Sequence, residues 1–146
     1  TPHGVMYMLD SINLEYHGKH AVILGTSNIV GRPMALELIN RGATVTMCNS
    51  KTRNVVELIG AADIVIAAIG RPNFVQGAWL KPGCIAIDVG INRLDTGKLC
   101  GDIEFTSAFE RAQYITPVPG GVGPMTIAML LKNTLHCYKL NTRKEV

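Results

Sequence analysis

The sequence is poor in aromatic residues and in charge, and both shortages exclude classes of protein. Aromatic residues make up 5% of the 146 residues, so aliphatic and β-branched side chains must fill the core, as in α/β proteins with buried parallel strands. Charged residues make up 17% and apolar residues 47%. That balance is typical of a single globular domain and excludes an intrinsically disordered chain.

The sequence also lacks a basic stripe and a long apolar run. The net charge is only +3, and the one basic cluster inside the fold region is Lys51-Thr52-Arg53. Nucleic-acid-binding proteins carry a denser basic surface, so we expect no nucleic-acid partner. The longest apolar run, residues 64–69, is too short to cross a bilayer, so we expect no membrane association.

Clustered metal or disulfide ligands are missing as well. The four cysteines are far apart and form no C-x-x-C pair, and the four histidines show no ligand spacing. Free thiols indicate a reducing compartment rather than a disulfide scaffold or a zinc site. We therefore expect no metal and a cytoplasmic location. The sequence opens at Thr1 rather than Met, so a leader could have been removed, and we expect a fragment.

What is present is a regular alternation of strand and helix patterns over one domain, residues 1–146. Strands are expected over residues 20–24, 44–48, 64–69, 84–89 and 114–116, and helices over 1–17 (an entry helix), 29–41, 54–62, 107–113 and 125–140, with a poor helix at 75–80, a hairpin over 92–101 and a tail over 141–146. This order predicts an α/β fold, a Rossmann-type doubly wound parallel sheet flanked by helices. Ligands bind such sheets at the carboxyl ends of the strands.

The turn after the first strand carries a glycine pattern suited to phosphate. It reads Gly25-Thr26-Ser27 and closes with Gly31, a G-x-S-x-x-x-G pattern in place of the usual G-x-G-x-x-G. A tight turn at a helix N-terminus brings backbone N–H groups and partial positive charge to a pyrophosphate. Ser27 replaces the middle glycine and adds a hydroxyl donor. A simple βα turn is the alternative interpretation.

The segment after the second strand indicates which dinucleotide is bound. Enzymes that prefer NAD usually place an acid there to bind the ribose 2′-hydroxyl, but residues 48–53 contain no acid and two cations, Lys51 and Arg53. Hydroxyl and cationic donors favour a 2′-phosphate. We therefore predict NADP, with a solvated turn as the alternative.

Four segments resemble one enzyme family in order and spacing. They are residues 25–33, Asp88-Val-Gly-Ile-Asn92, Gly101-Asp102 and Thr116-Pro-Val-Pro-Gly-Gly-Val-Gly-Pro-Met-Thr126. Together with the opening Thr1-Pro2-His3-Gly4, they resemble the C-terminal domain of bifunctional methylenetetrahydrofolate dehydrogenase/methenyltetrahydrofolate cyclohydrolases. The resemblance implies an NADP-binding domain that lacks the family's N-terminal catalytic domain.

Carried over residue by residue, the resemblance implies roles for specific positions. Gly25, Thr26 and Ser27 would contact the NADP phosphates, Ser50 the 2′-phosphate, and Ile91 the nicotinamide ribose. The positions that would border the folate substrate are Pro119, Gly120, Gly121, Val122, Gly123, Pro124, Met125, Thr126 and Ile127. A loop that only reverses the chain is the alternative for this last segment. Burial favours a structural role for Asp88, and the role of Asp102 stays open.

The Tyr-x-x-x-Lys motif that carries the family's chemistry does not occur in the sequence. Catalytic residues are therefore expected on the N-terminal domain and none in this chain. The intact protein, expected to be a homodimer, would oxidise 5,10-methylenetetrahydrofolate with NADP and hydrolyse the methenyl product to 10-formyltetrahydrofolate. Two alternatives remain at this point: the nucleotide domain of a shikimate or amino-acid dehydrogenase, and a non-catalytic NADP-binding module.

Overall fold

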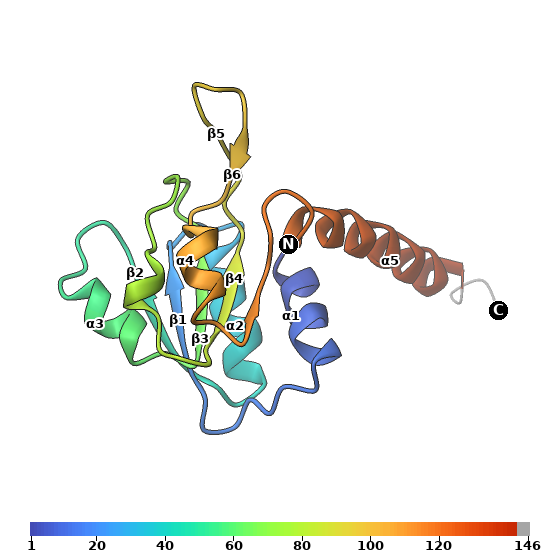
Figure 1. Cartoon of the computed structure of the whole chain (residues 1–146). Coiled ribbons are helices and arrows are strands. Elements are labelled where there is room, and N and C mark those ends of the chain that lie inside the picture. Colours follow the sequence, from blue (N-terminus) through green and yellow to red (C-terminus); the bar gives the residue numbers. More distant parts are fainter. Residues whose placement is uncertain (143–146) are drawn as a thin grey trace.

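A parallel sheet forms the centre of the molecule (Figure 1). The computed structural model describes residues 1–142. In spatial order the strands are β2 (Thr44–Cys48), β1 (His20–Leu24), β3 (Ile64–Ala67), β4 (Ile85–Asp88) and β7 (Tyr114–Ile115). Every neighbouring pair is parallel, so the expected doubly wound parallel sheet is confirmed. Because β2 and β3 lie on opposite sides of β1, the winding reverses between β1 and β3, and such a switch point opens a crevice for ligands.

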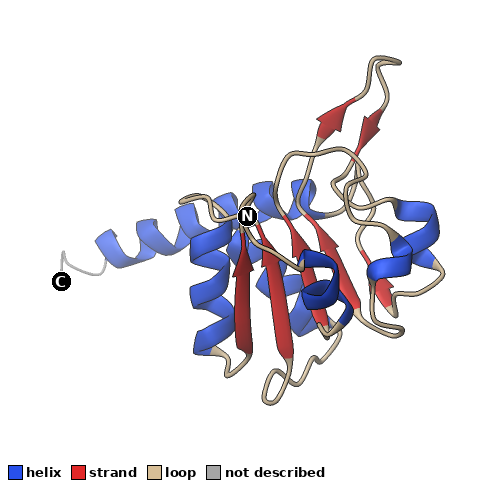
Figure 2. Ribbon diagram, turned by 90° about the vertical axis from the view of Figure 1, so that its left-hand side faces the viewer, coloured by secondary structure: helices blue, strands red, loops and turns tan. Residues whose placement is uncertain are grey.

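Helices cover both faces of the sheet, as Figure 2 shows. One face carries α1 (Pro2–Ser11) and α2 (Gly31–Asn40), and the other carries α3 (Val55–Gly60), the 3-10 turn η1 (Gly77–Trp79) and α4 (Phe105–Phe109). A two-stranded antiparallel hairpin, β5 (Asn92–Arg93) with β6 (Leu99–Cys100), stands above the sheet. The last helix, α5 (Val122–Thr142), starts beside the sheet and extends away from it.

Alternation along the strands explains why both faces need cover. In β1, Ala21 and Ile23 belong to the core under α1 and α2, whereas Val22 and Leu24 belong to the core under α3, η1 and α4. All four are at most 2% exposed. Successive side chains of a strand point to opposite faces, so a strand without polar alternation has to be buried on both sides.

All five expected helices have somewhat different bounds, and two of the differences have a visible cause. The first helix ends at Ser11 instead of residue 17. Just beyond its end, Asn13 adopts a left-handed conformation with φ of 53° and donates its N–H to the Asp10 carbonyl. The helix expected from Ser107 begins at Phe105, because the Glu104 carboxylate accepts hydrogen bonds from the backbone N–H groups of Thr106 and Ser107. Residues 75–80, expected as a poor helix, form only the turn η1.

The terminal helix also begins earlier than expected, at Val122 rather than Met125. Pro124 falls in its first turn, a position that tolerates proline because the N–H it lacks has no partner there. Of the tail expected over residues 141–146, Asn141 and Thr142 belong to α5, and residues 143–146 lie outside the described residues.

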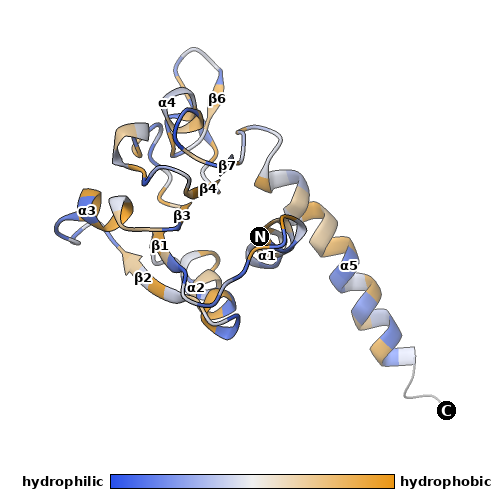
Figure 3. Ribbon diagram, turned by 60° about the horizontal axis from the view of Figure 1, so that its bottom comes forward, coloured by the Kyte–Doolittle hydropathy of each residue, from blue (hydrophilic) through white to orange (hydrophobic). Residues whose placement is uncertain are grey.

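Helix α5 is largely uncovered. Only Val122 and Met129 are buried in it, and the helix packs against α1 near its start, where the Thr1 and Thr126 hydroxyls lie 2.9 Å apart. Beyond that contact its apolar side chains are exposed, as the orange segments of α5 in Figure 3 indicate; they are Ile127, Leu130, Leu131, Leu135, Tyr138 and Leu140. Within residues 1–142, no helix is apolar enough over a sufficient length to span a bilayer.

The two leucines of α2 provide a test of this packing. Leu38 is fully buried, and Leu36, two residues earlier in the same helix, is 62% exposed. We expect Leu38→Ala to lower the free energy of unfolding by about 2–5 kcal/mol, through lost burial and the cavity that remains. Leu36→Ala should change it by no more than about 0.5 kcal/mol. Chemical denaturation followed by circular dichroism measures both, and equal losses would contradict the placement of α2.

Candidate functional site

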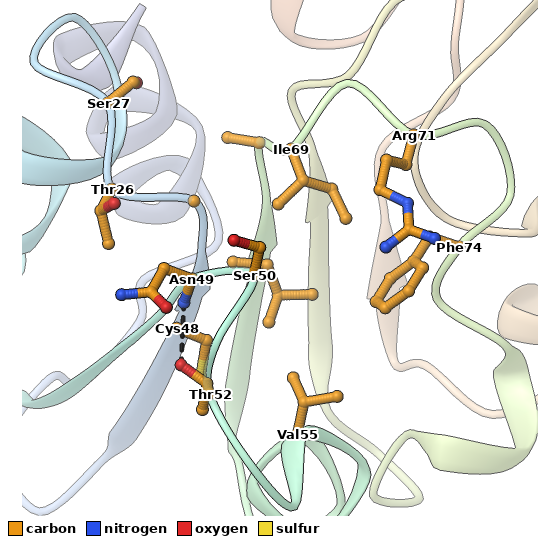
Figure 4. A pocket seen from close by; sticks show the side chains of 13 residues that line it. Thr26, Ser27, Cys48, Asn49, Ser50, Thr52, Val55, Ile69, Arg71 and Phe74 are labelled. Carbon is orange, nitrogen blue, oxygen red and sulfur yellow. Dashed lines mark hydrogen bonds between the residues drawn. The ribbon is translucent and has the colours of Figure 1, made fainter.

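A cavity of about 400 Å³ opens at the carboxyl ends of β2, β1 and β3. Its lining comes from the turns that follow these three strands, as Figure 4 shows: Leu24, Gly25, Thr26, Ser27, Cys48, Asn49, Ser50, Thr52, Val55, Ala68, Ile69, Arg71 and Phe74. The cavity therefore occupies the crevice at the topological switch point. We call it the switch-point cavity.

Two glycines shape the turn between β1 and α2. Gly25 has a φ of +110°, and a β-carbon there would collide with the Ala68 carbonyl oxygen. A β-carbon at Gly31 would collide with the Gly25 carbonyl oxygen. A positive φ and close backbone approach both favour glycine. The turn can therefore run tightly between β3 and the start of α2 only because both positions are glycine.

Ser27 stands where the usual dinucleotide pattern has a second glycine. Its hydroxyl oxygen accepts hydrogen bonds from the backbone N–H groups of Val30, at 3.2 Å, and Gly31, at 3.3 Å. The side chain thus satisfies donors at the start of α2, and its hydroxyl hydrogen remains available to a phosphate. Thr26 and Gly25 line the cavity beside it. The three residues predicted to contact phosphate are therefore brought together.

Asn49 organises the turn after β2. Its side-chain oxygen accepts from the Lys51 N–H at 2.9 Å, its carbonyl accepts from the Thr52 N–H, and its own N–H donates to the Thr52 hydroxyl. This compact turn leaves Ser50 lining the cavity, as the sequence predicted. The prediction of NADP also rested on two cations, Lys51 and Arg53. Both are exposed, and neither lines the cavity.

The third wall of the cavity was missed in the sequence. Ile69, Arg71 and Phe74 follow β3 and face the turn of Ser50 from the other side of the opening (Figure 4). The signal was present in Gly70-Arg71-Pro72, a turn directly after a buried strand. In a doubly wound sheet such a turn lies at the ligand-binding edge.

Ile91 and most of the predicted folate-bordering residues lie in a second, smaller depression. This depression, of about 250 Å³, is lined by Asp88, Val89, Gly90, Ile91, Leu99, Pro117, Val118, Pro119, Gly120, Gly121, Val122, Gly123 and Pro124. It lies at the carboxyl ends of β4 and β7, at the same sheet edge as the switch-point cavity. From β2 to β4 the edge covers three strand spacings, about 14 Å in all. The predicted cofactor residues therefore follow one line, with Ser50 at one end and Ile91 at the other.

The last three predicted folate-bordering residues do not line the second depression. A β-carbon at Gly4 of α1 would lie 3.2 Å from the Met125 main chain, so Met125 packs closely on that helix. The Thr126 hydroxyl contacts the Thr1 hydroxyl. Ile127 is 60% exposed. Met125 and Thr126 fix α5 against α1, while Pro119 to Pro124 belong to the lining of the second depression.

Two buried carboxylates bind the turns at this edge together. Asp102, fully buried, accepts hydrogen bonds from three consecutive backbone N–H groups, those of Ile69, Gly70 and Arg71, at 2.7, 3.0 and 2.9 Å. It also accepts one from the Asn92 side chain. The role of Asp102 that the sequence left open is thus to hold the turn after β3.

Asp88, 3% exposed, has a similar role at the end of β4. Its carboxylate accepts from the N–H groups of Gly90, Asp102 and Ile103, at 3.0, 2.9 and 2.7 Å. Burial raises the pKa of Asp88 to about 6, and the nearby charge of Asp102 adds to the increase, although the three N–H donors oppose it. These contacts support the structural role expected of Asp88. Among residues 1–142 there is no group of three or more side chains suited to hold a metal ion.

Comparisons with known proteins agree with this geometry. The family model for the NAD(P)-binding domain of tetrahydrofolate dehydrogenase/cyclohydrolase matches residues 1–142. The bifunctional protein FolD of Neisseria gonorrhoeae is 60% identical over 141 residues, which cover 97% of this chain and 50% of that protein. The chain therefore spans about half the length of the curated relatives it matches.

Solved structures give the same result. The bifunctional FolD enzyme of Campylobacter jejuni has 51% identity and a TM-score of 0.94, covering 96% of this chain and 50% of that one. The Trypanosoma brucei enzyme, solved with NADP and an inhibitor, has 44% identity and a TM-score of 0.92, covering 97% and 50%.

The raised pKa of Asp88 predicts a pH dependence of stability. A carboxyl whose pKa is raised from 3.8 to about 6 in the folded state contributes most to stability below pH 3.8 and loses that contribution as the pH rises through 6. The loss is about 3 kcal/mol, since one pKa unit corresponds to about 1.4 kcal/mol. Because Asn does not titrate, the free energy of unfolding of the native protein minus that of Asp88→Asn should fall by most of this amount between pH 4 and 7.

Denaturant titrations of both proteins across that range measure the difference. Asp10 and Asp63, whose pKa values are lowered by hydrogen bonds from Arg41 and from the His20 N–H respectively, are common to both proteins and cancel. If Asp88→Asn fails to fold, the carbon-13 shift of the Asp88 carboxyl in the native protein reports the same titration. A midpoint at or below 4 would contradict the prediction.

Proposed function

Since the chain belongs to the tetrahydrofolate dehydrogenase/cyclohydrolase family, as its NAD(P)-binding domain, we propose that it is the NADP-binding portion of a bifunctional enzyme. That enzyme oxidises 5,10-methylenetetrahydrofolate to 5,10-methenyltetrahydrofolate and hydrolyses the product to 10-formyltetrahydrofolate. The observation that carries this proposal is the line of predicted cofactor residues along the carboxyl edge of the sheet. Membership in this family sets aside a shikimate or amino-acid dehydrogenase.

The residues of the switch-point cavity suit the adenosine end of a dinucleotide. Gly25, Thr26 and Ser27 bring the start of α2 to the pyrophosphate, where backbone N–H groups and the helix dipole favour negative charge. Ser50 lies at the end of β2 and offers a hydroxyl to the ribose 2′ position. No Asp or Glu lines the cavity. A carboxylate would repel a 2′-phosphate, so its absence supports NADP over NAD.

The second depression suits the reacting end. Bound NADP supplies a nicotinamide that accepts a hydride from the methylene carbon of the folate. Ile91, beside this depression, would contact the nicotinamide ribose, and Pro119, Gly120 and Gly121 would form one wall for the folate. The chain's own contribution is to hold the nicotinamide and the folate in contact and to limit their motion. Such positioning supplies much of the rate acceleration of a bimolecular reaction. Proton transfer belongs to residues outside this chain.

We assign that chemistry to an N-terminal domain bearing the Tyr-x-x-x-Lys motif that this sequence lacks. The exposed apolar residues of α5, among them Leu130, Leu131 and Leu135, support a contact with another domain. Apolar patches of this kind mark interaction surfaces in soluble proteins.

The intact protein is proposed to be a homodimer. Strand β2 lies at an open edge of the sheet, where a second copy could pair with it, and sedimentation equilibrium of the intact protein tests the dimer. The free thiols of Cys48 and Cys84 support a cytoplasmic location.

If cofactor binding lies in this chain and proton transfer in an N-terminal domain, the chain alone should bind NADP but catalyse no reaction. Isothermal titration calorimetry of the purified chain should detect NADP, with lower affinity than the intact enzyme. Incubation with 5,10-methylenetetrahydrofolate and NADP should form no NADPH above the rate without protein, while the intact enzyme assayed in parallel does. Measurable turnover by the chain alone would contradict the assignment of catalysis to another domain.

The position of Ser50 predicts cofactor selectivity. Ser50→Asp should weaken NADP binding about ten- to a hundredfold, because one hydrogen bond to a charged group is lost and a repulsive charge is gained. NAD binding should be preserved, since an acid at this place accepts a hydrogen bond from the 2′-hydroxyl. Lys51→Gln is the matched control, with the same change of one charge unit at a neighbour that does not line the cavity. Unchanged NADP affinity in Ser50→Asp would mean that the 2′-phosphate binds elsewhere.

A further inference from the structure

Arg71 is the one charged side chain among the thirteen residues that line the switch-point cavity. It lies in the turn after β3, on the wall opposite Ser50 and Asn49 (Figure 4). Neither the glycine turn after β1 nor the polar turn after β2 puts a cation on the lining. The only cationic side chain that the lining offers to a bound anion therefore comes from the β3 side of the cavity.

The backbone of Arg71 is fixed by a buried carboxylate. Its N–H donates to Asp102 at 2.9 Å, and the two preceding N–H groups, those of Ile69 and Gly70, donate to the same carboxylate. Asp102 is itself fully buried and held by its own N–H, which donates to Asp88. The base of the arginine side chain is therefore anchored to a buried hydrogen-bond network at the sheet edge.

The guanidinium is positioned as well. Its central carbon lies 4.4 Å from the centroid of the Phe74 ring, a cation–π arrangement,. Phe74 in turn packs edge-on against Trp79, with ring centroids 5.6 Å apart. A long side chain held in this way loses little conformational entropy when it meets a ligand. The guanidinium of this exposed residue is thus pre-organised over the Phe74 ring at the cavity.

The negative charge of a 2′-phosphate gives the positioned Arg71 guanidinium a function. A 2′-phosphate carries up to two negative charges, and the hydroxyl of Ser50 can donate one hydrogen bond but cannot neutralise them. Lys51 and Arg53 do not belong to the lining, which leaves Arg71 as the cation within the cavity. Guanidinium groups are suited to phosphate because their fixed N–H donors match its oxygens.

From these observations we propose that Arg71 is a specificity-determining residue of this site: it supplies the positive charge that selects a dinucleotide with a 2′-phosphate over one without. The proposal rests on the NADP-binding function above and names a residue of that same site. It assigns to the turn after β3 the selectivity that the sequence places on the cations after β2.

Calorimetry on the purified chain tests the assignment with four ligands: NADP and 2′,5′-ADP, which carry the 2′-phosphate, and NAD and 5′-AMP, which do not. We expect Arg71→Gln to weaken the first pair about ten- to a hundredfold, the scale of a charge-assisted hydrogen bond. The second pair should change by less than about threefold, within the scatter of surface substitutions. Arg71→Lys keeps the charge and should retain the preference for NADP.

Arg53→Gln is the matched control, since it removes one positive charge from the neighbouring turn without altering the lining. Its NADP affinity should change by less than about threefold. Equal weakening of all four ligands by Arg71→Gln would overturn the proposal, since Arg71 would then serve the adenine ring. An effect of Arg53→Gln as large as that of Arg71→Gln would overturn it too.

Failure of the proposed function gives a different pattern. If the native chain binds none of the four ligands, the NADP-binding function itself is wrong, and the assignment of Arg71 falls with it. If the native chain binds NADP and Arg71→Gln binds it equally well, the function stands and only the role of Arg71 is wrong. Thermal unfolding of each variant, expected to match the native chain because Arg71 is exposed, confirms that binding is compared between folded proteins.

Discussion

Two buried carboxylates hold the carboxyl edge of the sheet together. Asp102 ties down the turn after β3, and Asp88 ties down the segment that contains Asp102. The Thr116 hydroxyl, after β7, accepts from the Asp88 N–H. Glycine is required beside both acids, because a β-carbon at Gly90 would collide with the Asp102 carboxylate and one at Gly101 with that of Asp88. Turns from three strands thereby become one rigid unit.

The burial of Asp88 and Asp102 costs free energy, and their position at the ligand-binding edge explains why the cost is tolerated. Two carboxylates buried close together repel each other and lose hydration, and the raised pKa of Asp88 records both effects,. Seven hydrogen-bond donors offset the cost, six of them backbone N–H groups. Asp102 lines neither the switch-point cavity nor the second depression. Its negative charge therefore holds the backbone in place, and the ligand meets Arg71 and the N–H groups of α2 instead.

The features that could be predicted from the sequence depend on residues close together in it. The strands, the glycine turn at Gly25 and the acid-free segment after β2 follow from local pattern and from the order of elements, and the family resemblance singles out Ser50 within that segment. Arg71 and Phe74 were missed because their place in the cavity depends on Asp102, which lies 31 residues from Arg71. Lys51 and Arg53 were weighed by charge alone, whereas the hydrogen bonds of Asn49 decide which side of that turn faces the cavity.

The two halves of the site differ in size and in the elements that line them. The switch-point cavity has walls from the turns after β1, β2 and β3, so the residues proposed for the adenosine end come from three elements of this chain. The second depression is smaller, and Ile91 in its lining is 62% exposed. A hydride transfer needs water excluded and both reactants held on two sides. One wall of glycine and proline cannot do that alone. The exposed Ile91 and the exposed apolar residues of α5 thus fit the same proposal, in which a second domain closes over the nicotinamide end and brings the residues that move protons.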